Sequence, residues 1–185
     1  MELKNYVLMK VKNVSLTNMG FVVFLTQQNQ DEVLPIFIGA SEAHSISAVL
    51  NQQIVTRPLS HDLMKNVLTE LDCQLEYILI TKIEEDTFYA ELVFENNGKQ
   101  MVVDARPSDA IALALRYKKD IYTHRKVINE ALVNLESEKE DKPAVDNLKN
   151  QHDVYKEAMN KAIAEERYED AAKLRDQLKS IQKTN

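Results

Sequence analysis

One stretch, residues 101–116, changes abruptly from strand-like to helix-like sequence and so limits how the surrounding chain can fold. Met101, Val102 and Val103 are apolar, and the two valines are β-branched, which favours an extended strand. Pro107 interrupts this pattern, because proline suits the first turn of a helix but not the interior of a strand. The alanine- and leucine-rich run that follows is apolar nearly all round, which predicts a buried helix.

Polar side chains gather where this strand is expected to meet this helix, namely Asp104, Arg106, Ser108 and Asp109. Functional groups often lie where a connecting segment meets a rigid scaffold. We therefore expect this strand-to-helix corner to carry the chemistry of the chain.

The hydrophobic patterns before and after this corner predict a domain that mixes strands and helices. Strands are expected at 6–14, 21–26, 33–38, 75–83, 87–95, 100–105 and 121–122, and helices at 42–52, at about 60–71 and after Pro107. The turn signals Asn18-Met19-Gly20 and Asn96-Asn97-Gly98 join consecutive strands. The sum predicts an α+β fold with a mostly antiparallel, curved sheet and about three helices packed on it.

Helix starts are the second feature that points to function. Ser41 is expected to cap the first helix and Ser60 the second, whose buried stripe would be Leu63, Met64, Val67, Leu68 and Leu71. Capping is one interpretation of the serines at helix starts. The other is that the helix starts converge on one cleft and bind phosphate. In that case the substrate-binding residues would be Arg57, Ser60, Arg106 and Ser108.

Four residues are the candidates for catalysis: His61, Asp62, Asp104 and Asp109. Phosphodiester cleavage needs an activated nucleophile and a positive charge near the phosphoryl oxygens, and a divalent ion held by carboxylates supplies both. Asp104 and Asp109 would be the ligands of such an ion, Mg²⁺ or Mn²⁺, although the sequence leaves the cofactor open. A histidine is an alternative general acid or base. In the structural interpretation, Asp104 forms an ion pair with Arg106 or Arg57.

The run DARPSDAIALALR resembles the signature of the bifunctional nuclease domain family. Three further segments match that family in the same order: LPIFIGASEAHSI, RPLSHDLMKNVLTEL and TFYAELVF. The resemblance covers roughly the first two thirds of the chain, which we assign to a domain at 1–133. It implies cleavage of DNA and RNA, so nucleic acid is the expected substrate.

The charge balance opposes this implied activity. The net charge is −6, and 17 acidic and 13 basic residues precede Glu136, so the first domain is itself acidic. Tight non-specific binding of nucleic acid relies on a basic surface. A nuclease with this balance would need a local basic patch, for which Arg57, Lys65, Arg106 and Arg116 are candidates, or a bridging metal ion.

The composition predicts a cytoplasmic protein. A lone Cys73 excludes an internal disulfide framework. No apolar run approaches the length of a membrane span, and the first residues lack the pattern of a signal peptide. The modest domain size and the expected edge strands also predict a homo-oligomer.

The sequence from residue 134 differs in character from what precedes it. A charged linker is expected at 134–147 and a helical hairpin at 148–185. Residues 159–176 resemble the UVR motif, which implies protein–protein contact. The expected partner-binding residues are Met159, Ile163, Tyr168, Ala172 and Leu174. An amphipathic hairpin folded back on the first domain is the alternative.

Two classes of function therefore remain at this point. The first is a nuclease that acts at the Asp104–Asp109 corner and contacts a protein partner through the hairpin. The second is a non-enzymatic, oligomeric binding or adaptor protein, which the acidic balance favours.

Overall fold

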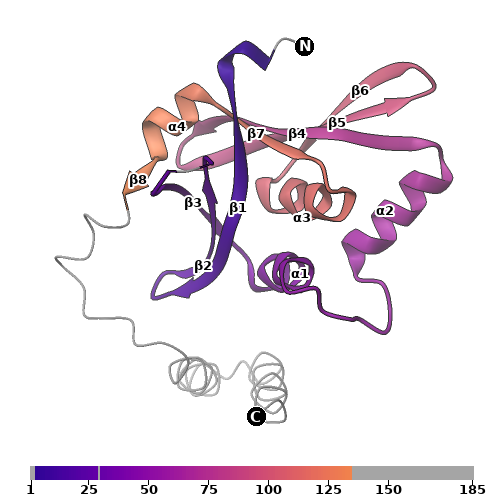
Figure 1. The fold of residues 1–185 in the computed structure, drawn as a ribbon, viewed down its shortest axis with the longest axis horizontal. Helices are drawn as coiled ribbons and strands as arrows, with labels where there is room; N and C mark the ends of the chain where they lie inside the picture. Colours follow the sequence, from indigo (N-terminus) through magenta and orange to yellow (C-terminus); the bar gives the residue numbers. More distant parts are fainter. Residues whose placement is uncertain (1–2, 29, 135–185) are drawn as a thin grey trace. The chain divides into compact units, whose positions relative to one another are not determined.

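An eight-stranded sheet organises residues 3–28 and 30–134, the part of the chain that the computed structural model describes (Figure 1). The strand order is β6-β5-β4-β7-β1-β2-β3-β8, and β4 with β7 is the one parallel pair in this sheet. The strands are β1 (Tyr6–Thr17), β2 (Gly20–Thr26), β3 (Glu32–Ile38), β4 (Cys73–Glu84), β5 (Thr87–Asn96), β6 (Lys99–Ala105), β7 (Asp120–His124) and β8 (Val133–Asn134). The expected α+β class with a mostly antiparallel sheet is confirmed.

Strand β1 takes part in both halves of the sheet. Its beginning, Tyr6 to Met9, pairs with β7, and its later residues pair with β2. The register shifts between Val11 and Asn13, and an irregularity of this kind bends a strand and increases its twist. In Figure 1, β1 accordingly runs across the direction of β4 and β5.

One face of the sheet carries the hydrophobic core. Ile80 of β4 lies opposite Ala90 of β5, and Ile78 lies opposite Leu92; all four side chains are buried. Leu79 and Val93, which point to the opposite face, are fully buried as well, so both faces of the sheet are covered at the centre of this strand pair. The β5–β6 turn contains Asn97 and Gly98, both with positive φ, as the Asn-Gly hairpin signal predicts.

Four α-helices accompany the sheet, preceded by a 3-10 turn at Leu3–Asn5. They are α1 (Ala40–Leu50), α2 (Ser60–Glu70), α3 (Pro107–Tyr117) and α4 (Arg125–Ala131). The five residues from Ala110 to Ala114 are fully buried, because α3 packs against β4, β5, α1 and α2. The helix predicted from the alanine-rich run is therefore the central helix of the domain, as Figure 1 shows.

Several expectations about helices were wrong. Helix α1 begins at Ala40 with Gly39 as its N-cap, and helix α2 begins at Ser60 with Leu59 as its N-cap, so neither Ser41 nor Ser60 caps its helix. Helix α2 has no buried residue, and four of the five residues of its expected core stripe are exposed: Leu63, Met64, Val67 and Leu71. Only Leu68 packs against the core. The short α4, which follows β7 and buries Val127 and Ile128, was not expected.

Apart from Asn134, the expected linker at 134–147 and hairpin at 148–185 lie outside the described residues, together with the five expected partner-binding residues. Within the described residues, no helix combines the length and hydropathy that crossing a bilayer would require.

Candidate functional site

The corner between β6 and α3 has the conformation that Pro107 predicts. Arg106 is the N-cap with an extended backbone, Pro107 is the first helical residue, and the Ala110 N–H donates to the Arg106 carbonyl at 3.0 Å. Because the chain turns at this point, the Arg106 side chain is 67% exposed although the helix that it precedes is buried. An exposed arginine side chain therefore lies at the start of the central helix.

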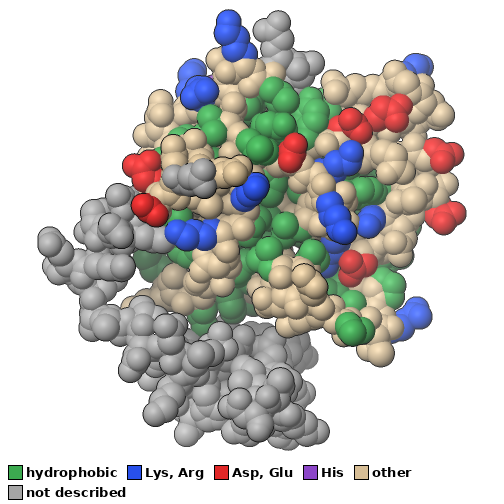
Figure 2. All heavy atoms as spheres, viewed as in Figure 1, with side chains coloured by type: hydrophobic (Ala, Val, Ile, Leu, Met, Phe, Trp, Pro, Cys, Tyr) green, Lys and Arg blue, Asp and Glu red, His purple; other side chains and the backbone are tan. Residues whose placement is uncertain are grey.

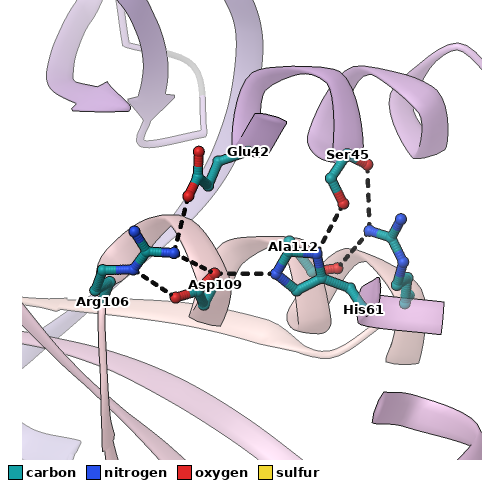
Figure 3. A network of polar contacts seen from close by, with 7 residues as sticks. Glu42, Ser45, His61, Arg106, Asp109 and Ala112 are labelled. Carbon is teal, nitrogen blue, oxygen red and sulfur yellow. Dashed lines mark hydrogen bonds and ion pairs between the residues drawn. The ribbon is translucent and has the colours of Figure 1, made fainter. Parts of the chain in front are cut away.

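Arg106 joins α3 to α1 through two carboxylates (Figure 3). Its Nε donates to Asp109 Oδ2 at 2.8 Å, and one terminal nitrogen donates to Asp109 Oδ1 at 3.1 Å and to Glu42 Oε1 at 2.8 Å. Gly39 makes this arrangement possible, since a Cβ added there would collide with the Glu42 carboxylate. A planar guanidinium gripped by two carboxylates is held in a fixed orientation.

His61 of α2 completes this cluster from the inner side, as Figure 3 shows. Its Nε2 lies 3.1 Å from Asp109 Oδ1, and its Nδ1 lies 2.9 Å from the Ser45 Oγ of α1. An ionised Asp109 can only accept, so the His61 Nε2–H donates to it, and Nδ1 forms a hydrogen bond with the Ser45 hydroxyl. The His61 side chain is 12% exposed. We call Glu42, Ser45, His61, Arg106 and Asp109 the Arg106 cluster.

The electrostatics of the cluster keep Asp109 ionised. Burial by itself raises the pKa of Asp109, but the hydrogen bonds from Arg106 and His61, together with their charges, outweigh it and lower the pKa below its usual value of 3.8. The cluster therefore presents a carboxylate, not a carboxylic acid, at neutral pH.

Asp62 belongs to a separate network around Arg116. Arg116 is 8% exposed, and its Nε donates to Asp62 Oδ1 at 2.7 Å. Its NH1 group donates to the carbonyl oxygens of Ser45 and Ala112. The other Asp62 oxygen accepts from the Leu59 N–H at 2.9 Å, which closes the start of α2. Burial raises the pKa of Asp62, but its bonds to Arg116 and Leu59 lower it overall.

A cleft of about 420 Å³ lies on the outer side of the Arg106 corner. We call it the Ser108 cleft; its lining residues come from the end of β3, the β4–β5 turn and the start of α3: Ile36, Phe37, Ile38, Gly39, Asp86, Thr87, Phe88, Arg106, Pro107 and Ser108. The predicted convergence on one cleft thus brings together Arg106 and Ser108 but not Arg57 or Ser60, which are exposed elsewhere.

Asp104 lies apart from the Arg106 cluster. It is exposed on β6 and faces Glu91 of β5. Within the described residues, no hydrogen bond or ion pair joins Asp104 to Asp109. In the same part of the chain, no group of three or more His, Cys, Asp and Glu side chains has the arrangement of a metal site. Both Asp109 oxygens accept from Arg106 and His61. Asp104 and Asp109 therefore do not fit a shared divalent ion in this arrangement.

The expected basic patch does not form from the four named residues. Arg116 is buried against Asp62, and Lys65 donates to the Arg116 carbonyl at 2.9 Å. On the face shown in Figure 2, Lys and Arg side chains alternate with Asp and Glu and are interrupted by a band of hydrophobic side chains.

The sequence patterns missed Ser45, and they indicated Arg116 only as part of a basic patch, not as the partner of Asp62. Arg116 follows Asp109 by seven residues, which places both on one side of α3. That spacing was the available signal. Nothing in the sequence near Ser45 indicates that its hydroxyl meets a histidine 16 residues later.

Comparison with known proteins finds a matching family model for each of two parts of the chain. The family model for the bifunctional nuclease domain matches residues 23–136, and the model for the UvrB/uvrC motif matches residues 149–184. An uncharacterised protein of Mycobacterium tuberculosis is 43% identical over 128 residues, which cover 67% of this chain and 75% of that protein.

Plant relatives are more distant. Bifunctional nuclease 1 of Oryza sativa subsp. japonica is 25% identical over 179 residues, covering 85% of this chain and 53% of the relative. Bifunctional nuclease 2 of Arabidopsis thaliana is 24% identical over 182 residues, covering 87% of this chain and 55% of the relative. The chain thus spans about half the length of these plant proteins. With its family model matched over more than half of its residues, the chain belongs to the bifunctional nuclease domain family.

Proposed function

We propose that this protein hydrolyses phosphodiester bonds in DNA or RNA and that the Arg106 cluster is its active centre. The observation that carries the proposal is the position of the exposed Arg106 guanidinium, which is paired with an ionised Asp109 and borders the Ser108 cleft. The names of the plant relatives support the same class of reaction.

Each member of the cluster has a distinct task in this proposal. Arg106 exchanges its bond to Glu42 for the phosphoryl oxygens, since a guanidinium matches phosphate geometry and offsets the charge that develops there. Asp109, whose side chain is 28% exposed, accepts a hydrogen bond from the attacking water and orients it. His61 is a positioning residue. Its Nε2–H orients the Asp109 carboxylate, and the Ser45 hydroxyl orients the imidazole ring of His61.

The acidic surroundings set a condition on this mechanism. Glu42 and Asp109 together exceed the single positive charge of Arg106, so a nucleic-acid strand binds weakly unless cations screen the site. Mg²⁺ or Mn²⁺ remains a candidate cofactor on these grounds. No step above uses a metal ion, and the assay below tests the requirement directly.

Nuclease assays of the purified full chain test the proposal. Single- and double-stranded DNA and RNA would be incubated with Mg²⁺, with Mn²⁺ and with EDTA. We expect Arg106→Gln to lower kcat/KM by about 100-fold, the usual loss for one group that stabilises developing charge. Glu42→Gln should instead lower KM about twofold to fivefold, because one competing ion pair is removed.

Arg125→Gln is the matched control, since Arg125 is exposed on α4 and lies outside the Arg106 cluster. Activity that survives Arg106→Gln would point to a different centre or to a contaminating enzyme. No cleavage of any substrate would refute the proposed activity.

A second candidate function is that of a non-enzymatic, oligomeric adaptor. The exposed apolar stripe of α2 and the match to the UvrB/uvrC motif favour it, because both provide surface for protein contact. A chain that cleaves nothing but forms a stable oligomer would fit this alternative. The cytoplasmic location stays a prediction under either function.

A further inference from the structure

The Ser108 cleft has the size and lining of a small-ligand site. Its volume of about 420 Å³ lies within the range typical of such sites. Phe37 and Phe88 provide aromatic rings, and Phe37 is 53% exposed, which is unusual for a large apolar side chain. Arg106, Thr87 and Asp86 add groups that can fix a polar ligand.

Ser108 is an independent sign of a ligand. The residue is 7% exposed and lines the cleft, and its hydroxyl has no hydrogen-bond partner among residues 3–28 and 30–134. Among the described residues, the fully buried side-chain oxygen without a partner is Thr123 Oγ1, not Ser108 Oγ. The Ser108 hydroxyl lies at the surface of the cleft, where a bound molecule can hydrogen-bond to it.

The start of α3 indicates the charge of that molecule. Arg106, the N-cap, makes no side-chain capping bond. Pro107 has no N–H and the Asp109 N–H donates to the Arg106 carbonyl at 3.1 Å, so the Ser108 N–H is the free backbone donor in the first turn of this 11-residue helix. Helix N-termini favour negative charge, and the guanidinium of the same Arg106 can donate to a phosphate when it exchanges its bond to Glu42. A phosphate group suits this end of the cleft.

We propose that the Ser108 cleft binds one nucleotide unit of a nucleic-acid strand, with its phosphate at Ser108 and Arg106 and its base beside Phe37. Aromatic side chains stack on nucleobases without regard to sequence, and Phe88 of β5 provides a second ring in the lining of the cleft. The inference rests on the proposed function, because the nucleotide is taken to be part of the strand that is cleaved.

Asp86 gives the site a preference among bases. Its carboxylate lines the cleft and accepts hydrogen bonds, and cytosine offers an exocyclic amino group where uracil has a carbonyl oxygen. Asp86 has a positive φ in the β4–β5 turn, a conformation that asparagine also tolerates. The cleft therefore binds cytosine nucleotides more tightly than uracil nucleotides, and Asp86→Asn removes the difference.

Calorimetric titration of the full chain tests this inference with four probes: 5′-CMP, 5′-UMP, cytidine and inorganic phosphate. We expect 5′-CMP to bind more tightly than each of the other three. Ser108→Ala should weaken the binding of 5′-CMP about tenfold, the usual loss of a hydrogen bond to a charged group. Phe37→Ala should weaken it by a similar factor through the loss of stacking.

Two matched controls keep the result interpretable. Ser15→Ala and Leu16→Ala alter a serine and a partly exposed apolar residue of β1, outside the cleft lining, and should leave 5′-CMP affinity unchanged. Circular dichroism checks that each variant is folded. Equal 5′-CMP affinity in the wild type, Ser108→Ala and Phe37→Ala would overturn the inference, as would the absence of saturable binding up to millimolar concentrations.

The same titration separates this inference from the proposed nuclease activity. The protein could bind 5′-CMP in a way that depends on Ser108 and Phe37 and yet cleave no substrate. That result would support the nucleotide site and reject the nuclease activity. Conversely, cleavage of nucleic acid without Ser108-dependent nucleotide binding would support the nuclease activity and reject the nucleotide site.

Discussion

Arg116 is the residue on which the packing of the first three helices depends most. Its guanidinium is buried in α3, pairs with Asp62 of α2 and donates to the Ser45 carbonyl of α1. Removing one partner of a buried ion pair leaves the other partner without compensation. Arg116 therefore acts as a structural connection between elements that are distant in sequence.

Replacing Arg116 with methionine keeps much of the side-chain volume but removes these bonds. We expect Arg116→Met to lower the free energy of unfolding by about 3 kcal/mol, measured by urea denaturation. Arg125→Met, at an exposed arginine of α4, should change it by less than about 0.5 kcal/mol. Equal effects of the two substitutions would contradict the connecting role of Arg116.

Sequence and structure agree best where one residue determines the local backbone. Pro107 predicts the turn from β6 into α3 because proline fixes its own φ. The Asn97-Gly98 pair predicts the β5–β6 turn because asparagine and glycine tolerate the positive φ that the turn requires. The contact between His61 and Asp109 spans 48 residues, so no local pattern reveals it. Tertiary packing alone brings those two side chains together.

At the scale of elements, α2 differs most from its sequence pattern. Apolar residues recur at helical spacing, yet the side chains of that stripe are largely exposed: Leu63 (58%), Met64 (47%), Val67 (49%) and Leu71 (64%). Periodicity identifies the apolar face of a helix but not what covers it. An exposed apolar surface of this kind is typical of an interface with another protein.

We expect a second copy of the chain to cover the α2 stripe, in agreement with the predicted homo-oligomer. Val67→Glu places a charge in the centre of the stripe and should convert the oligomer to a monomer, as measured by light scattering after gel filtration. Asn66→Glu adds the same charge at the neighbouring exposed position and should leave the mass unchanged. A wild-type protein that is already monomeric would contradict this expectation.

For the domain as a whole, two carboxylates link stability to pH. Asp62 and Asp109 have pKa values below the usual 3.8, because their bonds to arginine and histidine outweigh the effect of burial. Their contribution to stability is present above the pKa of the unfolded chain and is lost as the pH falls through the lower pKa of the folded state.

The free energy of unfolding should therefore decrease as the pH is lowered below about 4, the ordinary pKa of an aspartate. Urea denaturation at pH values between 7 and 2 measures this decrease. In Asp109→Asn the decrease should be smaller, because one of the two linked groups no longer titrates. An unchanged pH profile in that variant would contradict the role of Asp109 as a stabilising ion.

The parallel pair of β4 and β7 has a consequence for how the domain folds. Tyr77 lies opposite Asp120, and Tyr6 at the start of β1 lies opposite His124 of β7. The β1–β2–β3 and β4–β5–β6 parts of the sheet are joined only after the chain has been synthesised through residue 124, since β7 lies between β4 and β1 and pairs with both. Contacts between segments so distant in sequence slow folding, so we expect this domain to fold in about milliseconds to seconds. Until β7 has been synthesised, the strand edges that it will pair with are exposed and can aggregate with other chains.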